Sequence, residues 1–288
     1  MALTMAYIQI LPVDGTGEKI YPDAAMDAGT RGLIDTIDPW SWGGTTPAQG
    51  AALALGAGPR NYPLAEDGWI EDAAAAGVAG LTYNRGAVRF AAANDYLRLP
   101  RGFKIVPADT HFGHIFWLQN AMFPGQADNS NNNILADISG GNSKNLALSM
   151  TYASGAITSC RIESRRHNNL AVPTAWRAAL FDGTLHQFGL EVTVSADATT
   201  MTYGFYLDGA LIGTLTANIT NPYIAAGETD YVCFGRHHIN VGSGIYGRLW
   251  RAIFEDLTIS GARPMSETVA LDHSLNRARI AALAAVAP

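Results

Sequence analysis

Residues 203–215, with the sequence YGFYLDGALIGTL, predict a β-hairpin. Tyr203, Phe205 and Leu207 occupy alternate positions and therefore fall on one face of an extended strand. Asp208-Gly209 then supplies two residues that tolerate positive φ in a tight turn, and the aliphatic pattern resumes after it. The lone aspartate also admits a ligand-loop interpretation, but we favour turn chemistry. This hairpin indicates an antiparallel β protein.

Similar strand-like segments lie on both sides of the hairpin, separated by Gly, Asn, Asp and Ser turns. Residues 185–194 alternate most regularly, with His186 and Phe188 on one face and Gln187 and Glu191 on the other. The other segments of this kind are residues 87–90 and 96–100, around an Asn-Asp turn, and residues 111–123, 133–138, 146–152, 156–164, 231–235 and 249–260. Many short strands at a spacing of roughly 8 to 12 residues favour a sandwich. The predicted fold class is all-β, an antiparallel two-sheet jelly-roll sandwich.

The C-terminal segment changes to a helical period. Ser266 is the predicted N-cap, and an Ala- and Leu-rich run follows it. Leu275, Ile280 and Leu283 form the predicted packing face. We expect this helix to dock on the sandwich and to belong to the same domain, residues 87–288.

Residues 1–86 differ from the rest of the chain and predict an irregular N-terminal arm. Gly and Pro are frequent there, and the apolar residues follow no fixed period apart from a short helix predicted at residues 71–79. Trp40, Trp42 and Tyr62 are too apolar for a freely solvated linker. We therefore expect the arm to pack, either on its own sandwich or on a neighbouring subunit.

Composition excludes several classes of protein. Hydrophobic residues make up 48% of the 288-residue chain, which is long enough to bury a sizeable core. Charged residues make up 15%, against roughly 25% in an average soluble domain. The net charge of -6 disfavours nucleic-acid binding, and no apolar run reaches the length of a membrane span. The first residues carry no recognisable secretion signal, so we expect synthesis and retention in the cytoplasm until assembly or release.

The two cysteines lie in apolar, strand-like segments. Buried thiols are the favoured interpretation for Cys160 and Cys233, and a structural disulfide between them is the alternative. No CxxC pair occurs, so a cysteine zinc site is not expected.

Several of these segments together resemble the concanavalin A-like lectin/glucanase superfamily in its laminin G-like form, over residues 87–286. The segments that carry the resemblance are VRFAAANDYLRLP, HIFWLQ with Trp117, LHQFGLEVTVSADATTMTYGFYLDGALIGTL, and YGRLWRAIFEDLTISGARPMSETV with Met265, Ser266 and Glu267 at the helix start. Met265 for Leu, and Leu185 where the family often has Trp, are departures that remove nothing the fold needs. The resemblance implies a sandwich of two antiparallel sheets.

This superfamily hosts many functions, so the fold does not fix one. The absence of a signal, the charge-poor composition and the irregular arm make the chain look most like a bacteriophage virion structural protein. We therefore expect a non-enzymatic virion component, either in the tail or tail tip or as capsid decoration. It would be assembled in the host cytoplasm and packed with other virion subunits as a homo-oligomer. The alternative is a free carbohydrate-binding module or glycoside-active enzyme.

Catalytic signatures are missing from the sequence. Glycoside hydrolysis needs two carboxylates that flank one bond. Glu255 and Asp256 are adjacent and so point to opposite faces, and Glu191 has apolar neighbours on both sides. No GxSxG elbow supports a Ser-His-Asp set. We expect no enzymatic activity.

Metal binding has one weak candidate. Asp128, Asn131 and Asp137 offer oxygen ligands of the kind that calcium takes, although Asn also serves simply as a turn residue. His111 and His114 are three residues apart and would fall on opposite faces of a strand. We expect no cofactor, and calcium only at the acidic loop.

Glycan binding needs aromatic side chains with polar partners near strand ends. The candidate residues for such a site are Trp176, Tyr223, Tyr246, Trp250, Arg165 and Asn168, although for each of them we favour a role in packing or in a solvated loop.

Overall fold

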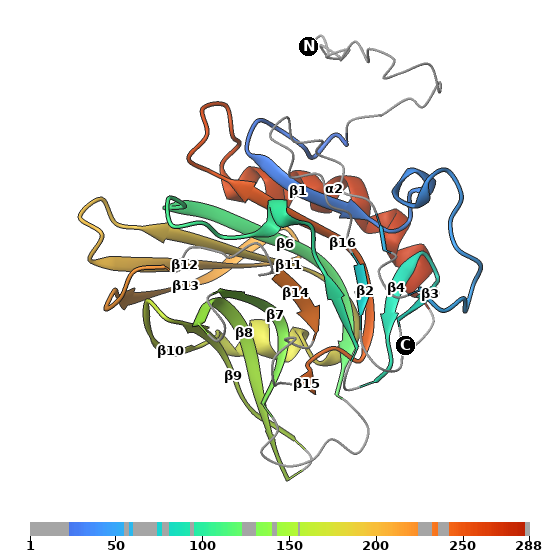
Figure 1. Cartoon of the computed structure of the whole chain (residues 1–288), viewed down its shortest axis with the longest axis horizontal. Coiled ribbons are helices and arrows are strands. Elements are labelled where there is room, and N and C mark those ends of the chain that lie inside the picture. Colours follow the sequence, from blue (N-terminus) through green and yellow to red (C-terminus); the bar gives the residue numbers. More distant parts are fainter. Residues whose placement is uncertain are drawn as a thin grey trace.

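The protein is a sandwich of two antiparallel sheets with a long helix on one outer face (Figure 1). This computed structural model describes residues 23–54, 58–59, 74–76, 81–92, 95–122, 131–139, 143–154, 156–223, 232–235 and 242–285. The predicted all-β fold class is confirmed.

Sheet A runs in the order β13-β12-β11-β6-β16-β4-β3, and β1 also pairs with β16. Its strands are β1 (Thr30–Asp35), β3 (Thr82–Asn84), β4 (Ala87–Phe90), β6 (His111–Ala121), β11 (Asp182–Val194), β12 (Thr200–Leu207), β13 (Ala210–Asn218) and β16 (Gly247–Asp256).

Sheet B runs in the order β10-β9-β8-β7-β14-β5-β2, and the short β15 lies parallel to β7. Its strands are β2 (Ala74–Ala76), β5 (Tyr96–Arg98), β7 (Asn131–Ser139), β8 (Ser143–Ala153), β9 (Ala156–Ser164), β10 (His167–Ala171), β14 (Val232–Gly235) and β15 (Gly242–Ser243). The helices are α1 (Thr174–Ala179), α2 (Met265–Ala284) and the 3-10 turns η1 (Pro39–Trp42) and η2 (Arg101–Phe103).

The hairpin at residues 203–215 forms as predicted. Leu207 pairs with Ala210, and the turn residues Asp208 and Gly209 have φ of 46° and 88°. Both values lie in the left-handed region that a two-residue hairpin turn requires. The register shifts opposite Phe205 and Tyr206, so β13 carries a bulge close to the turn.

One local prediction is confirmed and another is wrong. Strands form at residues 87–90 and 96–98 as predicted, and they do not pair with each other because β4 joins sheet A and β5 joins sheet B. Residues 74–76 of the predicted short helix are strand β2, which pairs with β5. The remainder of that predicted helix lies outside the described residues.

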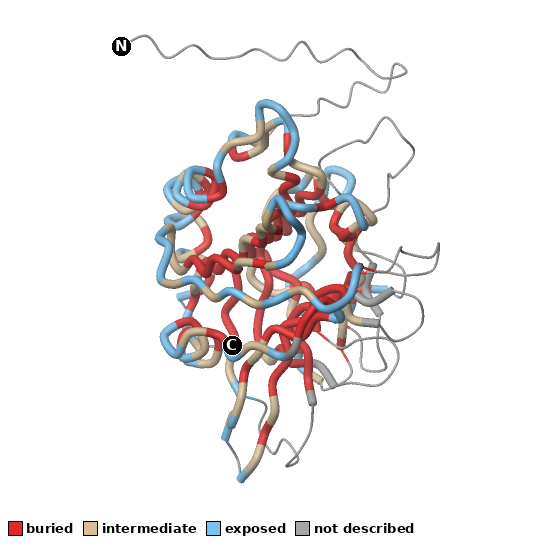
Figure 2. Tube along the Cα trace, turned by 90° about the vertical axis from the view of Figure 1, so that its left-hand side faces the viewer, coloured by how far each residue is buried: buried red, intermediate tan, exposed pale blue. Residues whose placement is uncertain are grey.

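The main core lies between the two sheets and is rich in aromatic rings. Phe116 stacks on Phe188 at 5.4 Å between centroids, and Phe234 of sheet B meets Phe116 edge-on at 5.2 Å. Trp176 of α1 enters the same cluster and donates from Nε1 to the backbone O of Tyr206 at 2.9 Å. Figure 2 shows that burial is concentrated in these layers.

The described part of the predicted arm belongs to the sandwich. β1 pairs with the second half of β16, while β4 pairs with the first half. Trp42 donates from Nε1 to the backbone O of Thr36 at 2.9 Å and meets Tyr83 edge-on. Trp40 is half-buried against a small apolar cluster on the outer face of sheet A. Both tryptophans therefore pack within the same chain, and Tyr62 lies outside the described residues.

Helix α2 covers the outer face of sheet A above a buried cation. Arg251 is fully buried and binds Asp23 and Asp272 at 2.7 Å and Asp35 at 2.8 Å. Asp272 also accepts from Trp117 Nε1 at 2.7 Å. These contacts join the N-terminal segment, β1, β16 and α2 around one guanidinium.

This arrangement corrects the predicted start and packing face of α2. Pro264 occupies the N-cap position, and Ser266 lies inside the first turn. Ile280 is buried as predicted, but Leu275 is 46% exposed. Polar Asp272 and Asn276 take the buried positions because they complete the Arg251 network.

Both cysteines are buried, free thiols, as the favoured interpretation predicts. Burial raises the pKa of Cys160 and of Cys233 to about 12. Among the described residues, no helix has the length and apolar character to cross a membrane.

Candidate functional site

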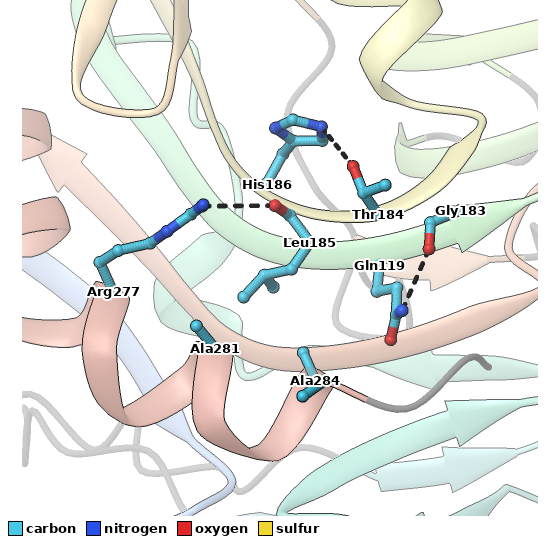
Figure 3. Close-up of a pocket in the computed structure, with 9 residues that line it drawn as sticks. Gln119, Gly183, Thr184, Leu185, His186, Arg277, Ala281 and Ala284 are labelled. Carbon is cyan, nitrogen blue, oxygen red and sulfur yellow. Dashed lines mark hydrogen bonds between the residues drawn. The ribbon is translucent and has the colours of Figure 1, made fainter.

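A groove of about 420 Å³ runs between the first residues of β11 and the C-terminal half of α2 (Figure 3). Leu185, Ala281 and Ala284 give it an apolar floor, and polar side chains stand along its rim. The complete lining is Gln119, Gly183, Thr184, Leu185, His186, Arg277, Ala281, Ala284 and Ala285. The groove exists because the small side chains of α2 face the sheet where β11 emerges from its N-terminal turn.

His186 has the most hydrogen bonds among the lining residues, and its imidazole stands on the face of β11 that carries Phe188, on the side of the strand away from Ala281 and Ala284 (Figure 3). Its Nδ1 lies 2.7 Å from Oδ2 of Asp208, in the hairpin turn. Its Nε2 lies 2.7 Å from Oγ1 of Thr184 and 3.0 Å from Oδ2 of Asp182. The hydrogen bond to Asp208, partly offset by desolvation and supported by Asp182, raises the pKa of His186 above 6.5.

This cluster has the connectivity of a hydroxyl–imidazole–carboxylate triad but not its protonation. Thr184 has one hydroxyl proton, and its Oγ1 also lies 2.8 Å from Oδ1 of Asp182. With an imidazolium, both ring N–H groups of His186 meet acceptors and Thr184 donates to Asp182. With a neutral ring, Nε2 would face the carboxylate of Asp182 through its lone pair. The cluster thus favours a cation at His186, which is the wrong state for a general base.

Arg277 closes the rim from α2. Its Nη1 lies 3.4 Å from the backbone O of Leu185 and 3.6 Å from Oδ1 of Asp208. The side chain is 46% exposed, so these are loose contacts at a solvent-facing edge. Gln119 stands at the other end of the groove and donates from Nε2 to the backbone O of Gly183 at 3.0 Å.

The sequence identified only parts of this site. Asp208 is a turn residue with positive φ, as predicted, but it also orders His186 and accepts from the backbone N of Gln187 at 3.0 Å. The turn interpretation of Asp208 is therefore confirmed, and its ligand-loop interpretation stays a hypothesis. The sequence did not identify Arg277 as a site residue, because its position opposite β11 depends on how α2 docks on the sheet.

The aromatic residues predicted for glycan binding are mostly core residues. Trp176 and Trp250 are fully buried, and Tyr223 is 6% exposed. Trp250 donates from Nε1 to the backbone O of Arg85 at 3.0 Å beneath α2. Arg166 covers the ring of Tyr223 at 4.4 Å. None of these three rings offers a free face, because each packs inside the molecule.

The remaining predicted glycan contacts do not gather at one place. Tyr246 is half-buried and precedes β16, where its backbone N donates to Oδ1 of Asn120 at 2.7 Å. Arg165 is exposed in the turn between β9 and β10. Asn168 lies in β10, and its side chain lies outside the described part of the chain.

The calcium candidates are not assembled in the described residues. Asp137 is buried and binds Nζ of Lys104 at 2.6 Å and the backbone N of Ile105 at 2.8 Å. Asp128 and the side chain of Asn131 lie outside the described residues. In the ranges that the structure describes, no group of three or more His, Cys, Asp or Glu side chains could hold a metal ion.

His111 and His114 lie on opposite faces of β6, as predicted. His111 binds Oε1 of Glu191 at 2.7 Å on the outer face. His114 is buried in the core, edge-on to Phe254 at 4.7 Å, and desolvation lowers its pKa to about 3. His114 is therefore a neutral core residue.

Two carboxylates from different strands lie on either side of one glycine of β6, a proximity that the spacing of residues in the sequence does not predict. Glu191 of β11 and Glu255 of β16 both pair with Gly113 of β6. Burial and the charge of Asp27 raise the pKa of Glu255 to about 8. Burial would also raise the pKa of Glu191, but hydrogen bonds from His111 and Tyr206 lower it overall.

Such a split in pKa is typical of an acid and a base in glycosidases. The side chain of Met265, however, packs directly on Gly113 between the two carboxylates. Glu255 and Met265 are both buried, so no substrate cavity joins this pair.

No family model and no curated protein matches the chain. Solved structures do match it. A Trypanosoma rangeli sialidase in complex with sialic acid matches with a TM-score of 0.53 at 12% identity, over 90% of this chain and 34% of that chain. A mutant of that sialidase with trans-sialidase activity matches with a TM-score of 0.52 at 13% identity, over 86% and 33%.

Domain 4 of a GH43 extracellular arabinanase from Geobacillus stearothermophilus, in complex with arabinotriose, has a TM-score of 0.49 at 10% identity. That match covers 85% of this chain and 98% of that chain. The chain spans about a third of the length of the sialidase chains. At 12% and 13% identity the two sialidase matches show a shared fold alone. These two matches support the predicted sandwich, and they support neither the laminin G-like subtype nor a phage origin.

Proposed function

We propose that the protein is a non-catalytic carbohydrate-binding sandwich module whose site is the groove between β11 and α2. The groove is the observation that carries the proposal. Its volume of about 420 Å³ falls within the range of small-molecule sites, roughly 300–1,000 Å³. An apolar floor beside polar rim groups suits a sugar ring, which has one apolar face and a belt of hydroxyls.

The structural matches agree with this proposal without carrying it. They come from glycoside-active proteins, which fits the carbohydrate alternative better than a virion role. A fold shared at 12% identity transfers no ligand, so the proposal rests on the groove.

A non-catalytic role follows from the state of the candidate catalytic groups. The hydrogen bonds of His186 to Asp208 and Asp182 favour its cationic form, and the carboxylates Glu191 and Glu255 are separated by Met265. We therefore expect a reducing-sugar assay on oligosaccharide substrates to detect no turnover. Turnover that disappears in Glu191→Gln would contradict this part of the proposal.

The proposal is tested on a glycan array with wild-type protein and two α2 variants. Ala281 lines the groove, so Ala281→Trp should fill it and abolish retention of glycans. Ala282 is exposed and outside the groove, so Ala282→Trp should bind like wild type. Equal retention by Ala281→Trp and wild type would place binding elsewhere, and no retained glycan would reject the function.

The virion location and the homo-oligomeric state stay predictions. Both concern where such a module is mounted, and glycan binding is compatible with display on a particle. Neighbouring genes for portal, capsid and tail proteins would support the virion location. Light scattering on the purified full chain would measure the subunit count.

A further inference from the structure

Most polar side chains of the groove have their hydrogen bonds satisfied inside the protein. Gln119 donates to the backbone O of Gly183, and its Oε1 accepts from Nη1 of Arg248 at 3.0 Å. Both ring nitrogens of His186 face Asp208 or the Asp182–Thr184 pair. A ligand in the groove would find few unoccupied donors on these residues.

Arg277 is the exception. Only its Nη1 has partners among the described residues, at 3.4 and 3.6 Å, and both distances are long for a charge-assisted hydrogen bond. Its Nε and Nη2 form no hydrogen bond with any described residue. Figure 3 shows the side chain reaching from α2 across the groove toward Leu185. A guanidinium with one unused edge matches the two oxygens of a carboxylate in a bidentate pair.

We infer that the groove selects glycans that carry a carboxylate, and that Arg277 binds this group; the inference rests on the proposed glycan-binding function. The acidic sugar ring would lie on Leu185 and Ala281 with its carboxylate toward the guanidinium. A neutral sugar would present only hydroxyls to the same edge, and these form weaker hydrogen bonds with a cation.

The charges around the groove make this selection dependent on pH. Asp182 and Asp208 are anionic, Arg277 and protonated His186 are cationic, and Arg248 adds a cation behind Gln119. His273, next to the hairpin on α2, is the other titratable neighbour. When His186 loses its proton, the net charge around the groove becomes more negative, and the two aspartates then repel a carboxylate more strongly. Binding of an acidic glycan should therefore weaken as pH rises through the pKa of His186, which lies above 6.5.

The test compares methyl β-glucuronide with methyl β-glucoside, which differ only in the carboxylate at C6. Binding at pH 6 is measured by NMR titration of the full chain, up to tens of millimolar ligand. We expect the glucuronide to bind about fivefold tighter, the contribution of one partly exposed ion pair. Arg277→Gln should reduce the glucuronide to the level of the glucoside. Arg177→Gln, on α1 at the core side of sheet A, should leave the preference unchanged.

The pH dependence gives a second readout. The preference of wild type for the glucuronide should fall between pH 6 and pH 9, and His186→Gln should flatten that profile. Equal binding of both glycosides, no binding of either, or an unchanged preference in Arg277→Gln would overturn the inference. If the array still retains neutral glycans in a manner blocked by Ala281→Trp, the proposed function stands while the inference falls. An array with no retained glycan removes both.

Discussion

His186 shows how much one residue can depend on charges from different elements. It lies on the face of β11 that strand alternation predicts, but its partners come from the turn after β12 and from the start of β11. The alternation of residues 186–194 was readable in the sequence because Phe188, Leu190, Val192 and Val194 all meet the core between the sheets. The partnership with Asp208 was not readable, since it depends on strand pairing across 22 residues.

Asp208→Asn should lower the pKa of His186 while keeping the turn. Asn tolerates positive φ, so the hairpin is retained and only the charge is lost. The hydrogen bond to Asp208 is the largest cause of the raised pKa, so Asp182→Asn should lower it less. NMR titration of the imidazole measures both, and the reverse order would contradict the assignment.

The same shift has a consequence for stability. In the folded protein the pKa of His186 lies above 6.5, its value in the unfolded chain. The contribution of His186 to the free energy of unfolding is therefore fully present below pH 6.5, and it is lost as the pH rises through the pKa of the folded state. Asp208→Asn should remove most of this pH dependence in urea unfolding.

We expect the ionisation of Glu255 to destabilise the folded protein, whereas the ionisation of a salt-bridged carboxylate stabilises it. Its pKa of about 8 means that the folded chain holds a proton that the unfolded chain releases above about 4.5. Stability should therefore fall as pH rises from 4.5 to 8. Glu255→Gln should add roughly 2–4 kcal/mol at pH 8.5 and little at pH 4.5. Exposed Glu267→Gln is the control, and an equal gain at both pH values would refute the protonation state.

Among the elements, helix α2 was predicted at the right place in the chain, but the prediction of its packing face was wrong. Its apolar residues predicted Leu275 as a contact, but the buried stripe contains Asp272 and Asn276. The buried Arg251 on the sheet requires a carboxylate such as Asp272 on the helix that covers it. Hydrophobic periodicity cannot predict buried polar residues of this kind. The position of the candidate groove follows from this docking.

Arg251→Met should loosen α2 and destabilise the protein by about 3–5 kcal/mol, because three carboxylates would lose their shared cation. Arg277→Met, on the exposed side of the same helix, should change stability by less than about 0.5 kcal/mol. Urea unfolding followed by circular dichroism measures both. Similar small effects in the two variants would show that the network does not hold the helix.

In the molecule as a whole, the first and the last described segments of the chain meet on the outer face of sheet A. Asp23 and β1 from the N-terminal segment, and α2 from the C-terminal segment, share contacts with Arg251 (Figure 1). The sandwich region was predictable because alternating strands and the Asp-Gly turn are local signals. The place of residues 23–53 was not predictable, because Gly- and Pro-rich segments show no period and their pairing is long-range.

Removal of residues 1–86 should therefore prevent folding. It deletes β1, β2 and β3 and leaves Arg251 without Asp23 and Asp35. Thermal unfolding of this truncated chain should lack a cooperative transition that the full chain shows under the same conditions. A cooperative transition would mean that the N-terminal segment is dispensable and acts only in assembly.

If the groove between β11 and α2 binds the ligand, an NMR titration will locate the contact on these elements. The titration uses the full ¹⁵N-labelled chain and the best-retained glycan of the array. We expect the largest chemical-shift changes on Gly183, Thr184, the Gln119 side chain and Arg277 Nε, and we expect Ala281→Trp to abolish them. Shifts that cluster instead on sheet B or in the turn at Arg165, with the groove residues unmoved, would contradict binding in the groove.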